Sequence, residues 1–204
     1  MSPVAYILAA LIGYAFGGIP TGILVARARH VDLTQVGSKK TGATNVLRTL
    51  GPAAAAVVFA GDFLKAVVAV SLVSWLFGDS WANAVAAVAA VVGHGFSPYI
   101  GFRGGRGVTP GLGGLLVVSW WIFLIALLVG VIVIALTRFV SLGSLLGTIV
   151  AALVIVYEVA VWGWPAAYML FGLGAAAFIV ASHHDNIQRL LAGRERKLGE
   201  PVQT

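Results

Sequence analysis

The chain of 204 residues contains no cysteine and only seven acidic residues. The absence of cysteine excludes disulfide bonds, thiolate metal sites and a cysteine nucleophile. Charged residues make up 10% of the chain and hydrophobic residues 60%, which excludes both an ordinary water-soluble domain and a disordered chain. The formal net charge is nevertheless +6. Because lysine and arginine gather in the cytoplasmic loops of membrane proteins, this charge indicates topology and predicts no nucleic-acid partner.

Long apolar runs are abundant and predict an all-α integral membrane protein. A helix needs about 20 mostly apolar residues to cross a hydrocarbon core of about 30 Å. The runs cover residues 2–26, 52–77, 81–99, 108–136, 142–161 and 165–181. No linker rich in serine, glycine or proline interrupts them and no polar motif is repeated, so residues 1–204 are expected to form a single membrane-embedded domain.

The run at residues 108–136 is long enough for one helix or for two short ones. Loop charges decide between these: the loop at residues 27–51 is basic, the link at residues 78–80 holds only an aspartate, and the loop at residues 102–107 holds two arginines. A single crossing would put the basic tail outside, whereas a break near residues 119–121 keeps every basic loop inside. The sequence therefore predicts seven transmembrane helices, with the N-terminus outside and the C-terminus inside.

The first half of the divided run, residues 108–118, would be a short span. Eleven residues reach only about 17 Å at about 1.5 Å per residue, which is too short to cross a bilayer. A short span brings loop backbone into the membrane beside it, and this is tolerated where protein or a water-filled cavity covers that backbone. We therefore expect a cavity on the cytoplasmic side near residues 102–109.

The basic loop before the second run combines glycines with neutral hydrogen-bond donors and an arginine. Glycine lets the backbone turn its N–H groups inward, and a forked guanidinium suits two phosphate oxygens. The residues concerned are Gly37, Ser38, Gly42, Thr44, Asn45 and Arg48. Their spacing does not match the nucleotide-binding P-loop. The pattern is typical of a phosphate-binding loop, and a flexible basic loop that only fixes topology explains the charges equally well.

A second glycine-rich loop, Arg103-Gly104-Gly105-Arg106-Gly107, directly precedes the predicted short helix. A helix N-terminus carries about half a positive charge, so an anion held there meets backbone donors and guanidinium groups together. Topology alone would require the arginines but not three glycines. We therefore favour phosphate binding by this loop.

Ionisable residues inside the runs and in the tail are the remaining candidates. Asp62 and Lys65 lie three residues apart, which favours a pair between them, with Asp62 alternatively holding an arginine of the site. His94 is either a structural donor to a carbonyl or a site residue. His183 and Asn186 are expected on one helical face, where the histidine would donate to a phosphate or stabilise developing charge. Four histidines without cysteine or a nearby pair of acids predict no metal site and no cofactor.

Two serines stand at the cytoplasmic start of the run at residues 142–161. We expect Ser141 to cap that helix, because serine is a common N-cap residue. Ser144, almost one turn further on, is a candidate for the cap or for the substrate site.

Together the motifs resemble those of the bacterial acyl-phosphate-dependent glycerol-3-phosphate acyltransferases. The resemblance covers nearly the whole chain in the family's motif order. Its pieces are Gly37-Ser38, Gly42 to Arg48, Asp62 to Lys65, Gly93 to Phe96, Phe102 to Val108 and His183 to Glu195. The chain lacks the histidine-x4-aspartate motif of the coenzyme A acyltransferases.

The resemblance implies a seven-helix enzyme of the bacterial cytoplasmic (inner) membrane with its active site facing the cytoplasm. Such an enzyme transfers a fatty acyl group from acyl phosphate to the 1-hydroxyl of glycerol 3-phosphate, giving lysophosphatidic acid and phosphate. Its expected partners are these two substrates and membrane lipid, and a monomer is expected. The implied active-site residues are Ser38, Arg48, Arg106, His183 and Asn186, with Thr44 and Asn45 in the phosphate-binding loop.

The chain departs from the family pattern at three places. Lys39-Lys40 stands where the family usually has Gly-Asn, Arg103 and Arg106 stand for lysines, and His184 stands for an arginine. Arginine keeps the charge of lysine but presents a planar fork, so a phosphate need not be held in the same pose.

Three functions remain to be distinguished on the residues alone. For the acyltransferase we favour direct attack of glycerol 3-phosphate on acyl phosphate without a covalent acyl-enzyme, because acyl phosphate is already activated. The first alternative is a small organic-phosphate transporter, since a basic cavity beside a short broken span suits one. The second is a scaffold that binds anionic lipid through its basic loops.

Overall fold

The computed structural model describes residues 1–200, and these fold into helices without any β-strand. The α-helices are α1 (Pro3–Gly18), α2 (Thr21–Arg27), α3 (Ala43–Leu50), α4 (Pro52–Phe77), α5 (Ser80–Gly95), α6 (Val108–Val118), α7 (Trp120–Thr137), α8 (Val140–Trp162), α9 (Ala167–Ser182) and α10 (His184–Leu191). A short 3-10 helix, η1 (Pro98–Ile100), follows α5. The expected all-α class is confirmed.

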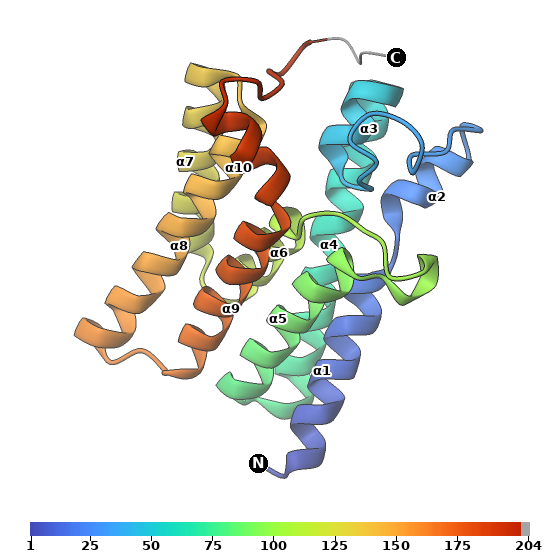
Figure 1. The fold of residues 1–204 in the computed structure, drawn as a ribbon. Coiled ribbons are helices and arrows are strands. Elements are labelled where there is room, and N and C mark those ends of the chain that lie inside the picture. The colour runs from blue at the N-terminus through green and yellow to red at the C-terminus, as the bar shows by residue number, and fades with distance from the viewer. Residues whose placement is uncertain (201–204) are drawn as a thin grey trace.

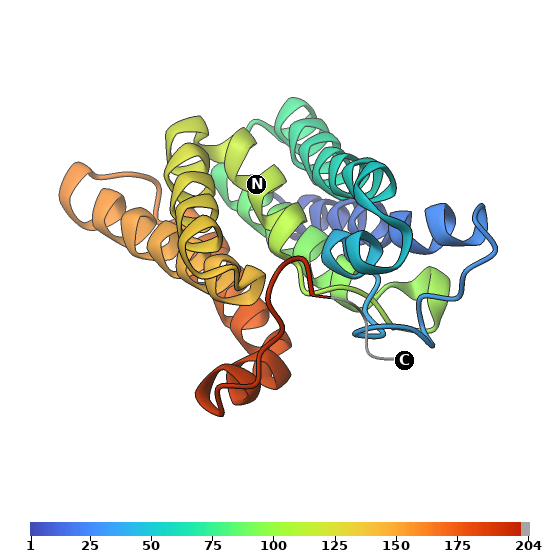
Figure 2. The ribbon, with the colours of Figure 1, turned by 90° about the horizontal axis from the view of Figure 1, so that it is seen from above.

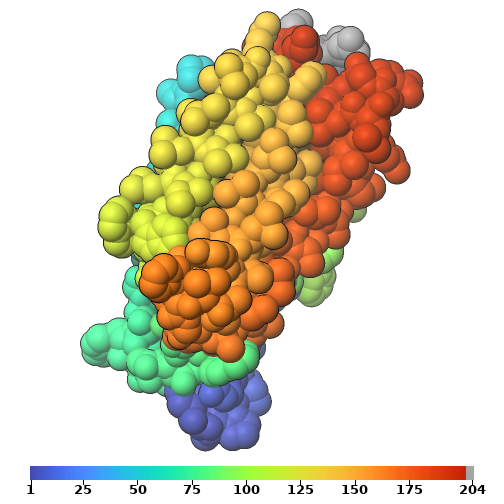
Figure 3. Space-filling view, turned by 90° about the vertical axis from the view of Figure 1, so that its left-hand side faces the viewer, coloured from blue at the N-terminus to red at the C-terminus, as the bar shows by residue number. Residues whose placement is uncertain are grey.

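The helices form a bundle with two groups and one helix between them. Helices α1, α4 and α5 pack together on one side, and α7 and α8 pack together on the other (Figure 1). Helix α6 lies between α4 and α7, as Figure 2 shows, and α9 packs on both α5 and α8. Figure 3 shows α7 and α8 running side by side over one face. Helices α3 and α10 lie at the end of the bundle opposite the N-terminus (Figure 1).

Several helices are suited to cross a membrane. Within residues 1–200, four segments are long and apolar enough by themselves, namely Pro3–Arg27, α4, α7 and α8. Helices α9 and α10, which meet at a bend of 62°, add a fifth if they are taken together. The chain is thus a multi-pass integral membrane protein. The number of seven spans, which would include the shorter helices α5 and α6, stays a prediction. The placement of the N-terminus outside and the C-terminus inside also stays a prediction.

The division of the long run at residues 108–136 is confirmed. Helix α6 ends at Val118, Ser119 is extended with φ −160°, and α7 begins at Trp120. The neighbouring Trp121 packs edge-on against Trp164 from the link after α8, with ring centroids 6.3 Å apart. The break therefore lies among aromatic side chains, as expected for a helix end at a membrane interface.

The first apolar run is helical in two pieces rather than one. Helix α1 ends at Gly18, and Pro20 precedes the first residue of α2. Proline has no N–H to donate and disfavours helical backbone at the residue before it, so the helical hydrogen bonding is interrupted here. The carbonyl of Ile19 accepts from the backbone N–H of Thr21 at 3.0 Å and from the side chain of Lys65 on α4 at 2.8 Å.

Close packing of α1 on α5 depends on small residues. A Cβ added at Gly13 would overlap the carbonyl of Ala86, and one added at Gly17 would overlap that of Ala90. Such contacts between small residues let two helix backbones approach closely inside a membrane. They fix the position of α5, whose last turn carries His94 to the site.

Candidate functional site

A cavity of about 310 Å³ opens among α3, α6, α7, α8, α9 and α10. One part is lined by polar groups: Ser38, Thr44, Arg48, Arg106, His183 and Asn186. The other part is lined by apolar groups: Leu112, Leu115, Ala126, Ala152, Ile155 and Phe171. The cavity includes residues 105–109, so its expected position beside the short helix is confirmed. We refer to the two parts as the polar mouth and the apolar slot.

The first glycine-containing loop is held in shape by Asn45. Its Oδ1 accepts from the backbone N–H of Ser38 at 2.9 Å, and its Nδ2 donates to the carbonyls of Val36 and Lys40 at 3.2 and 2.9 Å. Gly37 has φ +62°, and a Cβ there would overlap Oδ1 of Asn45. The side chain of Asn45 therefore shapes the loop, and it is only 2% exposed.

The start of α3 and Arg48 bring positive potential to the mouth. Gly42 is the N-cap of α3, and Gly42 and Thr44 both line the cavity, so the positive end of this helix faces it. Burial, followed by repulsion from Arg196, lowers the pKa of Arg48. Its Nε is buried without a hydrogen-bond partner within residues 1–200, and its Nη2 donates to the carbonyl of Arg196 at 3.4 Å. An anion in the mouth would satisfy both the charge and the free donor.

The second glycine-rich loop packs directly against the end of α5. The N–H of Gly105 donates to the carbonyl of His94 at 3.1 Å, and a Cβ at Gly104 would overlap that carbonyl. Gly107, with φ +85°, is the N-cap of α6 and lines the cavity. A second helix N-terminus thus faces the mouth. Arg103 is exposed and lies outside the cavity lining, so the structure does not bring it to the other candidates.

Arg106 lines the cavity but is largely engaged by protein groups. Its Nη2 donates to both carboxylate oxygens of Asp185, at 3.1 and 2.7 Å, and its Nε donates to the carbonyl of Ser182 at 3.2 Å. Asp185 is also paired with Arg189. Burial alone would raise the pKa of Asp185, but the hydrogen bond and charge of Arg106 lower it. The guanidinium fork therefore joins the loop to α10 as well as facing the mouth.

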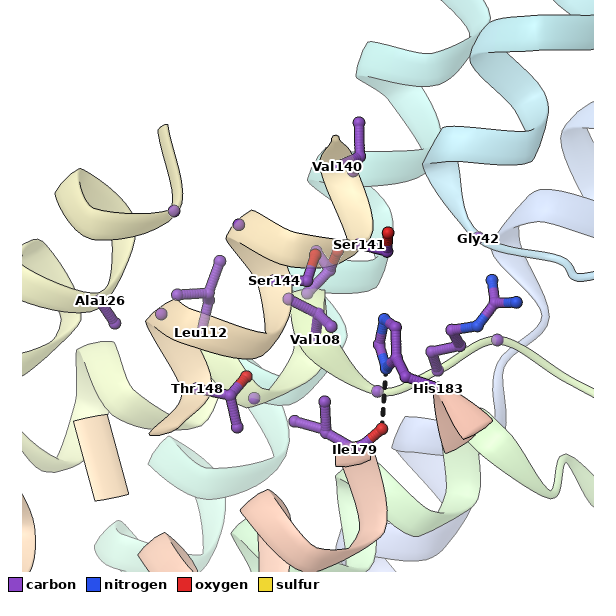
Figure 4. Close-up of a pocket in the computed structure, with 18 of the residues that line it drawn as sticks. Gly42, Val108, Leu112, Ala126, Val140, Ser141, Ser144, Thr148, Ile179 and His183 are labelled. Atoms are coloured by element: carbon purple, nitrogen blue, oxygen red, sulfur yellow. Dashed lines mark hydrogen bonds between the residues drawn. The ribbon is translucent and has the colours of Figure 1, made fainter. Parts of the chain in front are cut away.

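His183 lies at the break between α9 and α10 as the N-cap of α10, and it lines the same cavity as Asn186, three residues further along the chain. Its ring is directed into the pocket (Figure 4), and its Nδ1 lies 2.8 Å from the carbonyl of Ile179, to which it must donate. Burial lowers the pKa of His183 to about 4. The ring is therefore neutral at pH 7, and its Nε2 is an acceptor, not the donor that the sequence predicted.

Asn186 and Ser141 share one carboxylate. Nδ2 of Asn186 donates to Oε1 of Glu195 at 2.6 Å, and Oγ of Ser141 donates to the same atom at 2.8 Å. The prediction that Ser141 caps α8 is wrong, because α8 has no side-chain cap and the hydroxyl turns toward Glu195. Oδ1 of Asn186 is buried without a partner among the described residues.

Helix α8 contributes a row of hydroxyl groups to the cavity. Figure 4 shows Ser141, Ser144 and Thr148 on the side of α8 that faces the pocket. Ser144 was expected either to cap α8 or to lie at the substrate site, and it lines the cavity. Thr148, one turn below it, was not identified from sequence.

The expected pair of Asp62 and Lys65 is confirmed. Nζ of Lys65 lies 2.7 Å from Oδ1 of Asp62, and both side chains are buried. Nζ also lies 3.0 Å from Nδ1 of His94, which lines the cavity. Asp62 therefore contacts Lys65 and not an arginine of the site.

Three ionisable residues of the site lie within the motif from His183 to Glu195, but sequence reasoning assigned them no role. Asp185, Arg189 and Glu195 form an ion-pair cluster that links α10 to the mouth. The spacing of Asp185 and Arg189 is typical of a helical ion pair and was a usable signal. Glu195 reaches the site only through the fold of the tail. Within residues 1–200, no group of three or more histidine, aspartate or glutamate side chains is placed to hold a metal ion.

The fold and the site define a class of protein: a multi-pass helical membrane protein whose cavity joins an anion-binding mouth to an apolar slot. The family model described as glycerol-3-phosphate acyltransferase matches residues 7–193. The chain belongs to this family, which confirms the resemblance expected from the motifs. Its members are enzymes, so the acyltransferase is favoured over the transporter and the lipid-binding scaffold.

Relatives and solved structures agree with this assignment. Glycerol-3-phosphate acyltransferase of Synechococcus sp. (strain JA-3-3Ab) is 45% identical, over 95% of this chain and 94% of the relative. Glycerol-3-phosphate acyltransferase 1 of Deinococcus radiodurans is 43% identical, over 96% and 97%. Crystal structures of PlsY (YgiH), an integral membrane glycerol 3-phosphate acyltransferase, are similar in fold. Its glycerol 3-phosphate form has TM-score 0.88 and 36% identity, over 95% of this chain and 96% of that one. Its lysophosphatidic acid form has TM-score 0.86 and 35% identity, over 95% of each chain.

Proposed function

We propose that the protein transfers a fatty acyl group from acyl phosphate to the 1-hydroxyl of glycerol 3-phosphate, releasing lysophosphatidic acid and phosphate. The observation that carries this proposal is a single cavity in which a cationic, donor-rich mouth continues into an apolar slot. An acyl donor with a phosphate head and a hydrocarbon tail matches both parts. The forms in which PlsY was crystallised support glycerol 3-phosphate as the acceptor and lysophosphatidic acid as the product.

The length of the apolar slot suits a membrane-derived acyl chain. Along α8 the cavity lining extends from Ser141 to Ile155, which is about 21 Å at about 1.5 Å per residue. Acyl chains of one leaflet span about 15 Å, half of the hydrocarbon core. A long-chain acyl group therefore fits with its phosphate in the polar mouth.

In the proposed mechanism, the substrate hydroxyl attacks the acyl carbonyl directly. The new carbon–oxygen ester bond forms as the bond between the acyl carbon and the phosphate oxygen breaks, and the proton of the hydroxyl leaves with the released phosphate. Neutral His183 accepts a hydrogen bond from the hydroxyl through Nε2 and orients it. Its lowered pKa makes it a weak base, so a substrate phosphate is the better final proton acceptor.

The mouth supplies the electrostatic part of this mechanism. The N-termini of α3 and α6 and the guanidinium of Arg48 surround the region where phosphate charge grows on the leaving group. Ser38 lines the same mouth, and its Oγ makes no hydrogen bond within residues 1–200, so it can donate to the carbonyl or to phosphate.

We place the enzyme as a monomer of one domain in the bacterial cytoplasmic membrane, with the mouth open to the cytoplasm. Support comes from the basic residues of the loops and tail at the end of the bundle that holds α3 and α10. Glycerol 3-phosphate is charged and would reach the site from water on that side.

The decisive experiment supplies purified protein with palmitoyl phosphate and labelled glycerol 3-phosphate, without coenzyme A or acyl carrier protein. We expect labelled lysophosphatidic acid, and its loss in Arg48→Ala. Product formed from palmitoyl-coenzyme A but not from palmitoyl phosphate would contradict the proposed donor. An acyl group trapped on Ser38 in the parent protein would contradict direct attack.

A further inference from the structure

A buried ionisable cluster lies below the glycine-rich loop and is not used by the mechanism above. Asp62, Lys65 and His94 are 1%, 6% and 6% exposed. Charges in a membrane-embedded bundle are expensive, and where they occur they usually serve a function. The cluster joins the break after α1, the middle of α4 and the end of α5.

Every proton of the Lys65 ammonium group has an acceptor. Nζ lies 2.8 Å from the carbonyl of Ile19, 2.7 Å from Oδ1 of Asp62 and 3.0 Å from Nδ1 of His94. An ammonium group has three donors and no acceptor, so all three contacts are donated by Lys65. The Ile19 carbonyl, at the interruption before Pro20, also accepts from the backbone N–H of Thr21, and a carbonyl oxygen has two lone pairs, so it can accept from Lys65 as well.

These contacts determine where the proton of His94 lies. Since Nδ1 accepts from Lys65, the neutral ring carries its proton on Nε2. The alternative, a proton shared between Nδ1 and Asp62, is disfavoured because those atoms are 3.6 Å apart. The cluster then has one negative charge, one positive charge and a neutral ring, which is the least costly arrangement for buried groups.

Nε2 of His94 faces the polar mouth at the glycine-rich loop. A Cβ added at Gly105 would overlap Nε2, so the ring packs against the loop at a place that only glycine leaves open. His94 lines the cavity, and within residues 1–200 Nε2 has no hydrogen-bond partner. A donor of fixed direction is therefore presented beside the N-terminus of α6.

We propose that Nε2–H of His94 binds a phosphate oxygen of a substrate in the glycine-rich loop, and that Asp62 and Lys65 are positioning residues that fix its tautomer. The identity of the phosphate compound rests on the proposed function, whereas the donor itself does not. Glycerol 3-phosphate, acyl phosphate and inorganic phosphate all carry the required group.

Two substitutions at His94 separate this role from a purely structural one. His94→Asn keeps an atom at the Nδ1 position to accept from Lys65 and removes the donor that faces the mouth. His94→Gln places an amide near the Nε2 position and removes the acceptor for Lys65. We expect His94→Asn to fold with a thermal midpoint near that of the parent and to bind inorganic phosphate about tenfold or more weakly. We expect His94→Gln to lose more stability and less phosphate affinity.

The kinetic constants identify which phosphate is bound. KM for one substrate should rise about tenfold or more in His94→Asn, while KM for the other and kcat change less. Unchanged phosphate affinity and unchanged KM for both substrates in folded His94→Asn would overturn the proposal. Phosphate binding is measured by calorimetry without any acyl donor, so failure of the proposed acyl-phosphate reaction leaves this test intact.

Nitrogen NMR tests the tautomer of His94 in the parent protein itself. This test does not depend on the phosphate affinity of any variant. The four histidines are labelled with nitrogen-15, and the His94 signals are assigned by their absence in either substitution. We expect the Nε2–H tautomer and a shift of that signal on addition of inorganic phosphate. A proton on Nδ1, or a signal that phosphate does not move, would overturn the proposal.

Discussion

His94, at the end of α5, and His183, after α9, are both buried in the lining of one cavity and have opposite hydrogen-bonding states. His94 accepts from Lys65 at Nδ1 and so presents a donor to the cavity. His183, between α9 and α10, donates from Nδ1 to a carbonyl and so presents an acceptor. The two histidines thus serve different purposes because Nδ1 of each ring has a different partner. A phosphate suits the first histidine, and a hydroxyl suits the second.

The two arginines of the polar mouth also differ in their partners, and here we expect the largest effect. Arg48 has no carboxylate partner within residues 1–200, whereas Arg106 is paired with Asp185. Arg48→Ala should lower kcat/KM about 100-fold or more, and Arg106→Ala less, because Arg106 is partly neutralised. Steady-state assays check this, with exposed Arg29→Ala as a control. Equal losses at the two arginines would contradict this explanation.

The second effect is on stability at low pH. The pKa of His183 falls from 6.5 to about 4 on folding, so below pH 6.5 the unfolded chain binds the extra proton. Stability is complete above about pH 6.5 and is lost as the pH falls toward 4, by about 3 kcal/mol in total. Unfolding in detergent from pH 4 to 8 measures this against His183→Asn, which keeps Asp185 and Glu195. Parallel curves for the two proteins would refute the prediction.

The third effect tests the acceptor at His183. His183→Asn keeps a donor for the Ile179 carbonyl and removes Nε2, so the fold should persist while kcat falls about 10- to 100-fold. His183→Gln removes the donor and keeps a polar atom near Nε2. The prediction is checked by kcat together with the thermal midpoint of each variant. A larger kcat loss in the glutamine variant, with both folded, would argue against an acceptor role.

The fourth effect concerns the apolar slot of the cavity. Ala152 lines the slot and is 6% exposed, so Ala152→Leu should shorten the space for an acyl chain. We expect kcat/KM for palmitoyl phosphate to fall about tenfold relative to decanoyl phosphate. Ala160→Leu, on the exposed side of the same helix, is the matched control. An unchanged ratio in Ala152→Leu would place the acyl chain elsewhere.

The smallest effect concerns the loop beside α3. Lys39 has φ +57°, a left-handed conformation that favours glycine, and it stands where the family pattern has glycine. Lys39→Gly should raise stability by about 0.5–1 kcal/mol, the relief of strain being partly offset by the greater freedom of glycine in the unfolded chain. Lys40→Gly, at a position without positive φ, should lower it. The same sign for both variants in thermal unfolding would contradict this explanation.

Sequence reasoning was most successful where one local signal sufficed. The break at Ser119 followed from charge counting, and the pair of Asp62 and Lys65 followed from their spacing. It failed where a contact joins distant segments. Ser141 was expected to cap α8, but its hydroxyl bonds to Glu195, 54 residues further along the chain. His183 was expected to be a donor, but the carbonyl of Ile179 and burial make its outer nitrogen an acceptor.

The sequence by itself determined the class of the protein, the family and the segments that carry the site, because hydropathy, charge bias and motif order are properties of the linear chain. Only the tertiary structure decided what each polar group does. It paired Arg106 with Asp185, left Nε of Arg48 without a partner and set the opposite tautomers of the two histidines. Hydrogen-bond partners and burial depend on which helices meet, and no local pattern specifies them.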